Sequence, residues 1–216
     1  MMIIARKHML RRLVLGFSSL LLLVGLAGCT INIGGTGSAT PSPKPTPTQP
    51  PAPSPTPALA LTTYTATGYS IGYPASAGWT KQVSGPLVTF QDAQQLNKLA
   101  VGTVPNPGGT QSADSVATAS LTTLESAFNV KNAQPANVPA TTTVAGESWT
   151  QKGITGNVTE NGVTVPVELI VLADNHPASS ANTQTYEIGY AGPTAIFSQT
   201  NAAIFQPMLQ SFKFTA

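Results

Sequence analysis

The sequence predicts an α+β domain in residues 61–216, since strand patterns and helical patterns follow one another along this part of the chain. Short runs of alternating apolar and polar residues come first, up to residue 104. An apolar stripe of helical period then covers 112–128, and a long hairpin pattern surrounds Asn161-Gly162. A closing helical pattern over 194–211 completes the expected order of elements.

The first expected strands are short and lie close together. The run YSIGYP, residues 69–74, alternates Tyr69, Ile71 and Tyr73 on one side and ends at a proline. Further strands are expected at LTTYTATG, GWTKQV, LVTFQD and KLAVGTV, with glycine or polar turn residues between them. These segments predict a set of strands before the first helix.

The first helix is expected over residues 112–128, where the period of the apolar residues changes. Ser112 or Asp114 can cap its N-terminus. The apolar stripe consists of Ala117, Leu121, Leu124 and Phe128.

The next segments predict a long hairpin and one more strand. ESWTQKGITGNVTE and VTVPVELIVLAD flank Asn161-Gly162, a dipeptide that favours a type I′ turn. Pro166 lies in the second of these strands, so its missing N–H should face outward or lie at a bulge. In TQTYEIGYAG, Tyr186, Ile188 and Tyr190 fall on one side.

The closing helix is expected to be interrupted. Pro207 lies inside the pattern of 194–211, and proline kinks or shortens a helix. Phe212 and Phe214 are expected to pack the end of the chain onto the core. The apolar stripe consists of Phe205, Met208, Leu209 and Phe212.

Residues 1–28 have the pattern of a signal peptide. Four basic residues and no acidic residue precede an uncharged run, 13–28, which ends in small residues. From Cys29 onward the chain holds six lysines, no arginine and eight acidic residues, a net charge of −2. The basic balance therefore belongs to the signal, and a nucleic-acid partner is not expected.

Leu26-Ala27-Gly28-Cys29 matches the lipobox of bacterial lipoproteins, and Cys29 is the only cysteine of the chain. A diacylglycerol thioether on this sulfur, cleavage before Cys29 and acylation of the new amino group, for example with palmitate, would anchor the chain in a membrane. Residues 29–60 follow as a lipidated N-terminus and tether. Nine of the seventeen residues from 41 to 57 are proline, which predicts a polyproline II spacer of roughly 50 Å at ~3.1 Å per residue.

Several segments of residues 62–214 resemble a superfamily of α-β-α sandwich proteins. They are YSIGYPASAGW, TTTVAGESWTQ, TYEIGYAGP and FQPMLQSFKF. The superfamily includes the photosystem II oxygen-evolving-enhancer extrinsic proteins, a Ran-binding nuclear import factor and many bacterial lipoproteins of unassigned role. The resemblance implies a central antiparallel sheet with helices on both faces, and an accessory or binding role. It carries over no functional residue.

Residues with catalytic potential are few. His176 with Asp174 nearby is expected to be a polar hairpin-loop histidine, because no nucleophile motif accompanies it and two residues make at most a weak metal pair. Glu168 and Glu187 lie in strands that could be neighbours, which could place both carboxylates on one face, as glycoside hydrolysis needs. The alternative, which we favour, is that they are polar residues on the less buried side of a sheet.

The aromatic residues allow a binding groove. Tyrosines and tryptophans of the domain either pack in the core, as is more usual, or line a groove for a sugar, peptide or apolar ligand. The groove candidates are Trp79, Trp149 and Tyr186, with the two tryptophans expected to be its exposed members.

We therefore expect a lipoprotein on the extracytoplasmic face of the cell membrane that presents a non-catalytic binding or accessory domain. Its partners would be the membrane, through Cys29, and a protein in the membrane or wall. No catalytic residue, metal or cofactor is expected. Two alternatives remain open: an extracytoplasmic hydrolase that uses paired carboxylates, and a lipoprotein that captures substrate for a transporter.

Overall fold

The computed structural model describes residues 59–160 and 162–215. The predicted signal peptide, Cys29 and the tether up to residue 58 lie outside these residues, as does Asn161 of the predicted turn.

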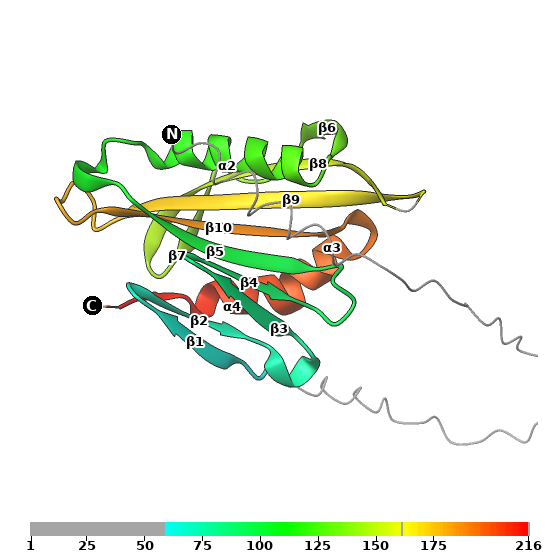
Figure 1. Cartoon of the computed structure of the whole chain (residues 1–216), viewed down its shortest axis with the longest axis horizontal. Coiled ribbons are helices and arrows are strands. Elements are labelled where there is room, and N and C mark those ends of the chain that lie inside the picture. Colours follow the sequence, from blue (N-terminus) through cyan, green and yellow to red (C-terminus); the bar gives the residue numbers. More distant parts are fainter. Residues whose placement is uncertain (1–58, 161, 216) are drawn as a thin grey trace, which may run out of the picture. The chain divides into compact units, whose positions relative to one another are not determined.

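An antiparallel sheet of eight strands forms the centre of the described domain (Figure 1). The strands follow the order β3, β4, β5, β10, β9, β8, β6. Strand β6 pairs with the C-terminal part of β8, and β7 pairs with its N-terminal part. Their bounds are β3 Thr80–Ser84, β4 Leu87–Gln91, β5 Lys98–Pro105, β6 Lys131–Pro135, β7 Thr141–Val144, β8 Glu147–Glu160, β9 Val163–His176 and β10 Gln184–Pro193.

The hairpin predicted around Asn161-Gly162 forms the longest pair of this sheet. Strands β8 and β9 pair from Glu160 opposite Val163 to Thr150 opposite Ala173. Gly162 has φ +79°, a conformation that glycine adopts without steric cost. Pro166 of β9 lies beyond Val167, the last residue of this strand that pairs with β10. Among the described residues, β8 is therefore the only strand beside this position, which has no N–H to donate.

Helix α2 (Ala113–Ala127) covers one face of the sheet, and the expected 112–128 helix is confirmed. Ser112 caps it, because its hydroxyl oxygen accepts a hydrogen bond from the Ser115 N–H. Of the predicted stripe, Ala117 is fully buried and packs with Val171 and Ala173 of β9.

The other face of the sheet carries the last helices and a second sheet (Figure 1). The predicted interruption at Pro207 is present: α3 (Thr194–Thr200) passes through a π-helical segment, η3 (Asn201–Phe205), into α4 (Gln206–Ser211). Proline has no N–H to donate and its ring conflicts with the carbonyl four residues earlier, which explains why regular α-helix resumes only at this point.

The second sheet joins the two ends of the described chain, which the sequence did not predict. Strands β1 (Thr62–Ala66) and β2 (Tyr69–Tyr73) form a hairpin, and β11 (Lys213–Phe214) pairs with β2. Two short 3₁₀ turns complete the elements, η1 (Ala75–Ala77) and η2 (Pro107–Gly109).

The main core lies between the large sheet, the closing helices and this second sheet. Phe90, Leu99, Leu172, Ile188 and Phe205 are all fully buried there. Helices thus cover both faces of a central antiparallel sheet, and the predicted α+β class is confirmed.

Candidate functional site

Glu168 and Glu187, considered above as a possible pair of carboxylates, do not lie on one face of the sheet. Strands β9 and β10 are neighbours, but Glu168 lies opposite Gly192 whereas Glu187 lies opposite Ala173. Along β9, Glu168 and the partner of Glu187, Ala173, are five residues apart, about 17 Å at ~3.3 Å per residue. An odd separation also places side chains on opposite faces, so Glu168 points to the main-core face and Glu187 to the α2 face. The hydrolase hypothesis based on this pair is wrong.

The three aromatic groove candidates are core residues. Trp149 is 0% exposed, Trp79 6% and Tyr186 3%, so the expectation that the tryptophans are exposed is wrong. The Trp79 ring meets the ring of Phe205 edge-on, and the Trp149 ring likewise meets that of Phe212. The reason is the second sheet and the C-terminal segment, which cover the face of the large sheet on which these side chains lie.

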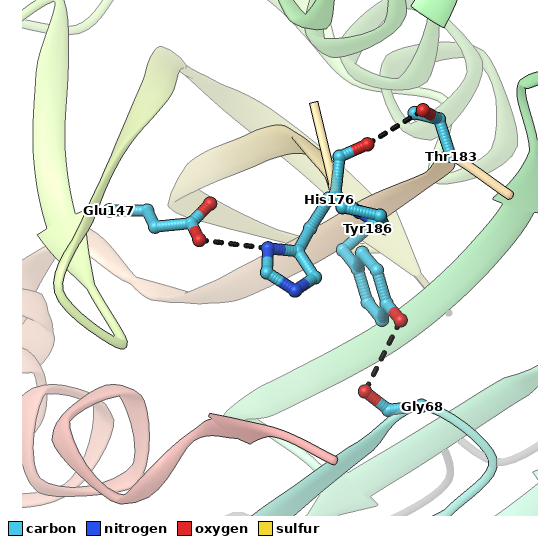
Figure 2. A network of polar contacts seen from close by, with 6 residues as sticks. Gly68, Glu147, His176, Thr183 and Tyr186 are labelled. Carbon is cyan, nitrogen blue, oxygen red and sulfur yellow. Dashed lines mark hydrogen bonds and ion pairs between the residues drawn. The ribbon is translucent and has the colours of Figure 1, made fainter. Parts of the chain in front are cut away.

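A cluster of ionisable side chains lies at one end of the main-core face. The Nδ1 atom of His176 is 2.8 Å from Oε1 of Glu147, and the His176 ring stacks on the Phe214 ring with centroids 3.6 Å apart. Figure 2 shows the Glu147 carboxylate and the His176 ring facing each other, with Tyr186 beside them. The Tyr186 hydroxyl donates a hydrogen bond of 3.2 Å to the Gly68 carbonyl.

Asp174 belongs to the same cluster. The pKa of its carboxyl is raised to about 6, mainly by burial and in addition by a hydrogen bond with Glu147 and by the charge of Glu147, while the Asn175 backbone and His176 oppose the rise. One of its oxygens, Oδ2, is buried without a hydrogen-bond partner. A carboxyl group with this environment holds its proton up to a pH at which exposed carboxyls are ionised.

The register of the hairpin explains why these residues meet. Thr150 pairs with Ala173, and the same register extended toward the start of β8 places Trp149 beside Asp174 and Glu147 beside His176. His176 is therefore the last residue of β9, with its ring partly covered, and not the loop histidine that the sequence predicted. Glu147 was missed at the sequence level, although the two-residue turn already specifies its partner.

A groove of about 220 Å³ lies on the opposite, α2 face of the sheet. It forms because α2 packs mainly over β8 and β9, so the strands β4 and β5 are left beside the helix. Its lining is Leu87 of β4, Ala100 and Gly102 of β5, Val171 of β9, Glu187 and Gly189 of β10, and Ser120, Thr123, Leu124, Ala127 and Phe128 of α2 and its C-terminal cap.

Glu187 is the only charged residue in this lining. Its Oε2 atom accepts a hydrogen bond from the Ser120 hydroxyl of α2, and the side chain is half-buried. The rest of the wall is mostly apolar or has no side chain, with Gly102 and Gly189 in the floor.

Within residues 59–160 and 162–215, no three His, Cys, Asp or Glu side chains are placed to hold a metal ion. No helix in this described part is long and apolar enough to cross a membrane. Cys29, the predicted lipidation site, lies outside it.

Comparison with known proteins assigns no family. No family model and no curated protein matches the chain. Solved structures that are similar to this chain include a protein from Bacteroides thetaiotaomicron. It is 8% identical over 71% of this chain and 48% of its own, with a TM-score of 0.44. Another is LpqN of Mycobacterium tuberculosis, described as involved in cell envelope biogenesis, which is 13% identical over 73% of this chain and 91% of its own, also with a TM-score of 0.44. The chain thus spans about half the length of the Bacteroides protein.

Proposed function

We propose that this protein is a bacterial lipoprotein that is anchored through Cys29 on the extracytoplasmic face of the cell membrane. Its domain, from residue 61 onward, acts there as a non-catalytic binding or accessory module. The lipobox Leu26-Ala27-Gly28-Cys29 supports the anchor, and the proline-rich tether supports presentation of the domain away from the lipid surface.

One observation favours binding over catalysis. An active site brings a ligand-sized cavity together with titratable groups whose pKa values are shifted. In the described part of this domain the two are separated by the sheet: the groove lies on the α2 face, whereas Asp174, with its raised pKa, lies on the main-core face. The groove itself has the character of a binding site, with mostly apolar walls and a single charged group.

The tether adds to such a function. Confinement of a binding domain within some tens of ångströms of a membrane raises its effective concentration toward partners in the membrane or wall. A small molecule held in the groove could equally be passed to a transporter in the same membrane, which is the second candidate function that the groove favours.

The anchor is tested with full-length protein and the Cys29→Ala variant, expressed in a lipoprotein-processing bacterium that is fed an alkyne analogue of palmitate. We expect label and membrane sedimentation for the wild type and neither for the variant. Protease added to spheroplasts should digest the domain, because it lies outside the membrane. Label that persists in the variant, or a domain protected from protease, would contradict the proposal.

The binding role is tested by cross-linking the lipidated protein in its own cells and identifying the co-purified proteins by mass spectrometry. The control carries an unrelated domain on the same signal, Cys29 and tether. One protein enriched over this control would support an accessory role. An enzymatic turnover by the purified chain, measured on envelope extracts, would overturn the non-catalytic assignment.

A further inference from the structure

The chemistry of the groove on the α2 face specifies a class of ligand. We propose that it binds a small amphiphile with an apolar body and a protonated amino group, whose ammonium pairs with Glu187. This inference rests on the proposed binding function and names its ligand class.

The size and walls of the groove fit an apolar body. An apolar cavity of about 150 Å³ is enough for a benzene ring, so about 220 Å³ accommodates a ring or a short alkyl chain. Leu87 on one side and Leu124 and Phe128 on the other provide apolar contact, while Gly102 leaves the floor open. A side chain at Gly102 would project into this space, because a Cβ atom built there meets only Leu87 Cδ1, at 3.6 Å.

The charge of the groove fits a cation. Glu187 projects from the middle of β10, and Ser120 fixes one of its oxygens from the helix wall. A ligand that covers this half-buried carboxylate removes water from it, which is unfavourable unless the ligand supplies a donor or an opposite charge. An ammonium group supplies both, whereas a carboxylate head group would be repelled.

One cation of the α2 face is already paired with another carboxylate. Lys152, which also lies on the α2 face, is paired with Asp114 at the start of α2, with 2.7 Å between its Nζ and Oδ1 of the aspartate. The hydrogen bond from Ser120 is neutral and leaves the charge of the carboxylate in place. Glu187 is therefore the charged group that the lining of the groove offers to a ligand.

The test uses the mature chain from residue 29 with Cys29→Ser, so that no lipid competes for the groove. Hexylamine, hexanol and hexanoate are titrated by ligand-observed NMR. We expect hexylamine to bind about tenfold more tightly than hexanol, and hexanoate to bind most weakly. In the Glu187→Gln variant hexylamine should weaken to the level of hexanol, while hexanol itself should be unchanged.

The location is tested with two identical substitutions on one helix. Ala127→Leu fills the groove and should abolish binding of both hexylamine and hexanol, whereas Ala119→Leu, at an exposed position of α2, should leave both unchanged. Gly102→Val blocks the floor from the sheet side and is the second blocking variant if Ala127→Leu unfolds. Thermal unfolding of each variant establishes that it is folded.

The outcomes separate this inference from the proposed function. Hexanoate that binds as well as hexylamine, or binding that survives both blocking variants, overturns the inference and leaves a binding domain in place. Equal binding of hexanol and hexylamine retains the groove as a site and overturns the role of Glu187. No binding of any probe also overturns the inference, and the cross-linking experiment then decides whether the proposed function fails with it.

Discussion

Replacement of Asp174 by asparagine should stabilise this protein at neutral pH. The carboxyl lies beside that of Glu147, and its Oδ2 atom is buried without a hydrogen-bond partner. An asparagine of the same shape carries no charge, and its amide can donate a hydrogen bond to the Glu147 carboxylate. The substitution therefore removes an unfavourable ionisation and adds a donor where one is lacking.

The magnitude follows from the pKa of Asp174. Its ordinary value is 3.8, and in the folded protein it is raised to about 6. Between these pH values the folded state binds more protons than the unfolded state, so the free energy of unfolding falls as pH rises from about 4 to about 6. The full difference corresponds to about 3 kcal/mol, and solvent screening of this half-buried group reduces the expected effect to about 1.5 kcal/mol.

The assay is urea unfolding of the mature, unlipidated chain at pH 4.0 and pH 7.5. At pH 7.5 Asp174→Asn should raise the free energy of unfolding by about 1.5 kcal/mol and the midpoint temperature by about 3–6 °C. At pH 4.0 the gain should disappear, because the wild-type carboxyl is then protonated.

Asp114→Asn is the matched control for this prediction. Asp114 is exposed, pairs with Lys152 and lies in the first turn of α2, so the same change of charge should slightly lower the stability at pH 7.5. The reasoning is refuted if Asp174→Asn destabilises the protein at pH 7.5, or if its effect is the same at both pH values.

Three further substitutions test the packing and the helix cap by urea unfolding. Ser112→Ala removes the cap of α2 and should cost about 1 kcal/mol, whereas Ser112→Gly should cost only a few tenths; equal costs would argue against capping. Trp149→Ala should cost about 3–5 kcal/mol because the side chain is fully buried, and a cost below 1 kcal/mol would contradict its place in the core. Gly156→Ala should destabilise the protein by about 1–3 kcal/mol, since the added Cβ would meet Val130 and lie 3.0 Å from the Lys131 carbonyl oxygen. Gly102→Ala is the control that should be tolerated, because there is space for a Cβ at Gly102. Equal effects of the two substitutions would count against this geometry.

Local patterns predicted several elements of this fold, but not β6 and β7. The apolar stripe and Ser112 predicted α2, and Asn161-Gly162 predicted the hairpin of β8 and β9, because in both cases the signal lies within the segment that folds. The second sheet escaped prediction, because β11 pairs with β2 from the opposite end of the domain. The burial of Trp149 depends on that sheet and on the C-terminal residues, so no local pattern indicates it.

The two groups of ionisable residues show how far the sequence can define a site. A two-residue turn fixes which residues face each other along the whole hairpin, so Glu147 and His176 could have been paired from the sequence once Asn161-Gly162 was accepted as the turn. No comparable rule applies to Glu168 and Glu187, because the loop of residues 177–183 joins their strands and its length does not dictate the register. One residue more or less in that register would have placed both carboxylates on the same face. Short turns therefore make the faces of neighbouring strands predictable, whereas longer loops leave this to the packing of the whole domain.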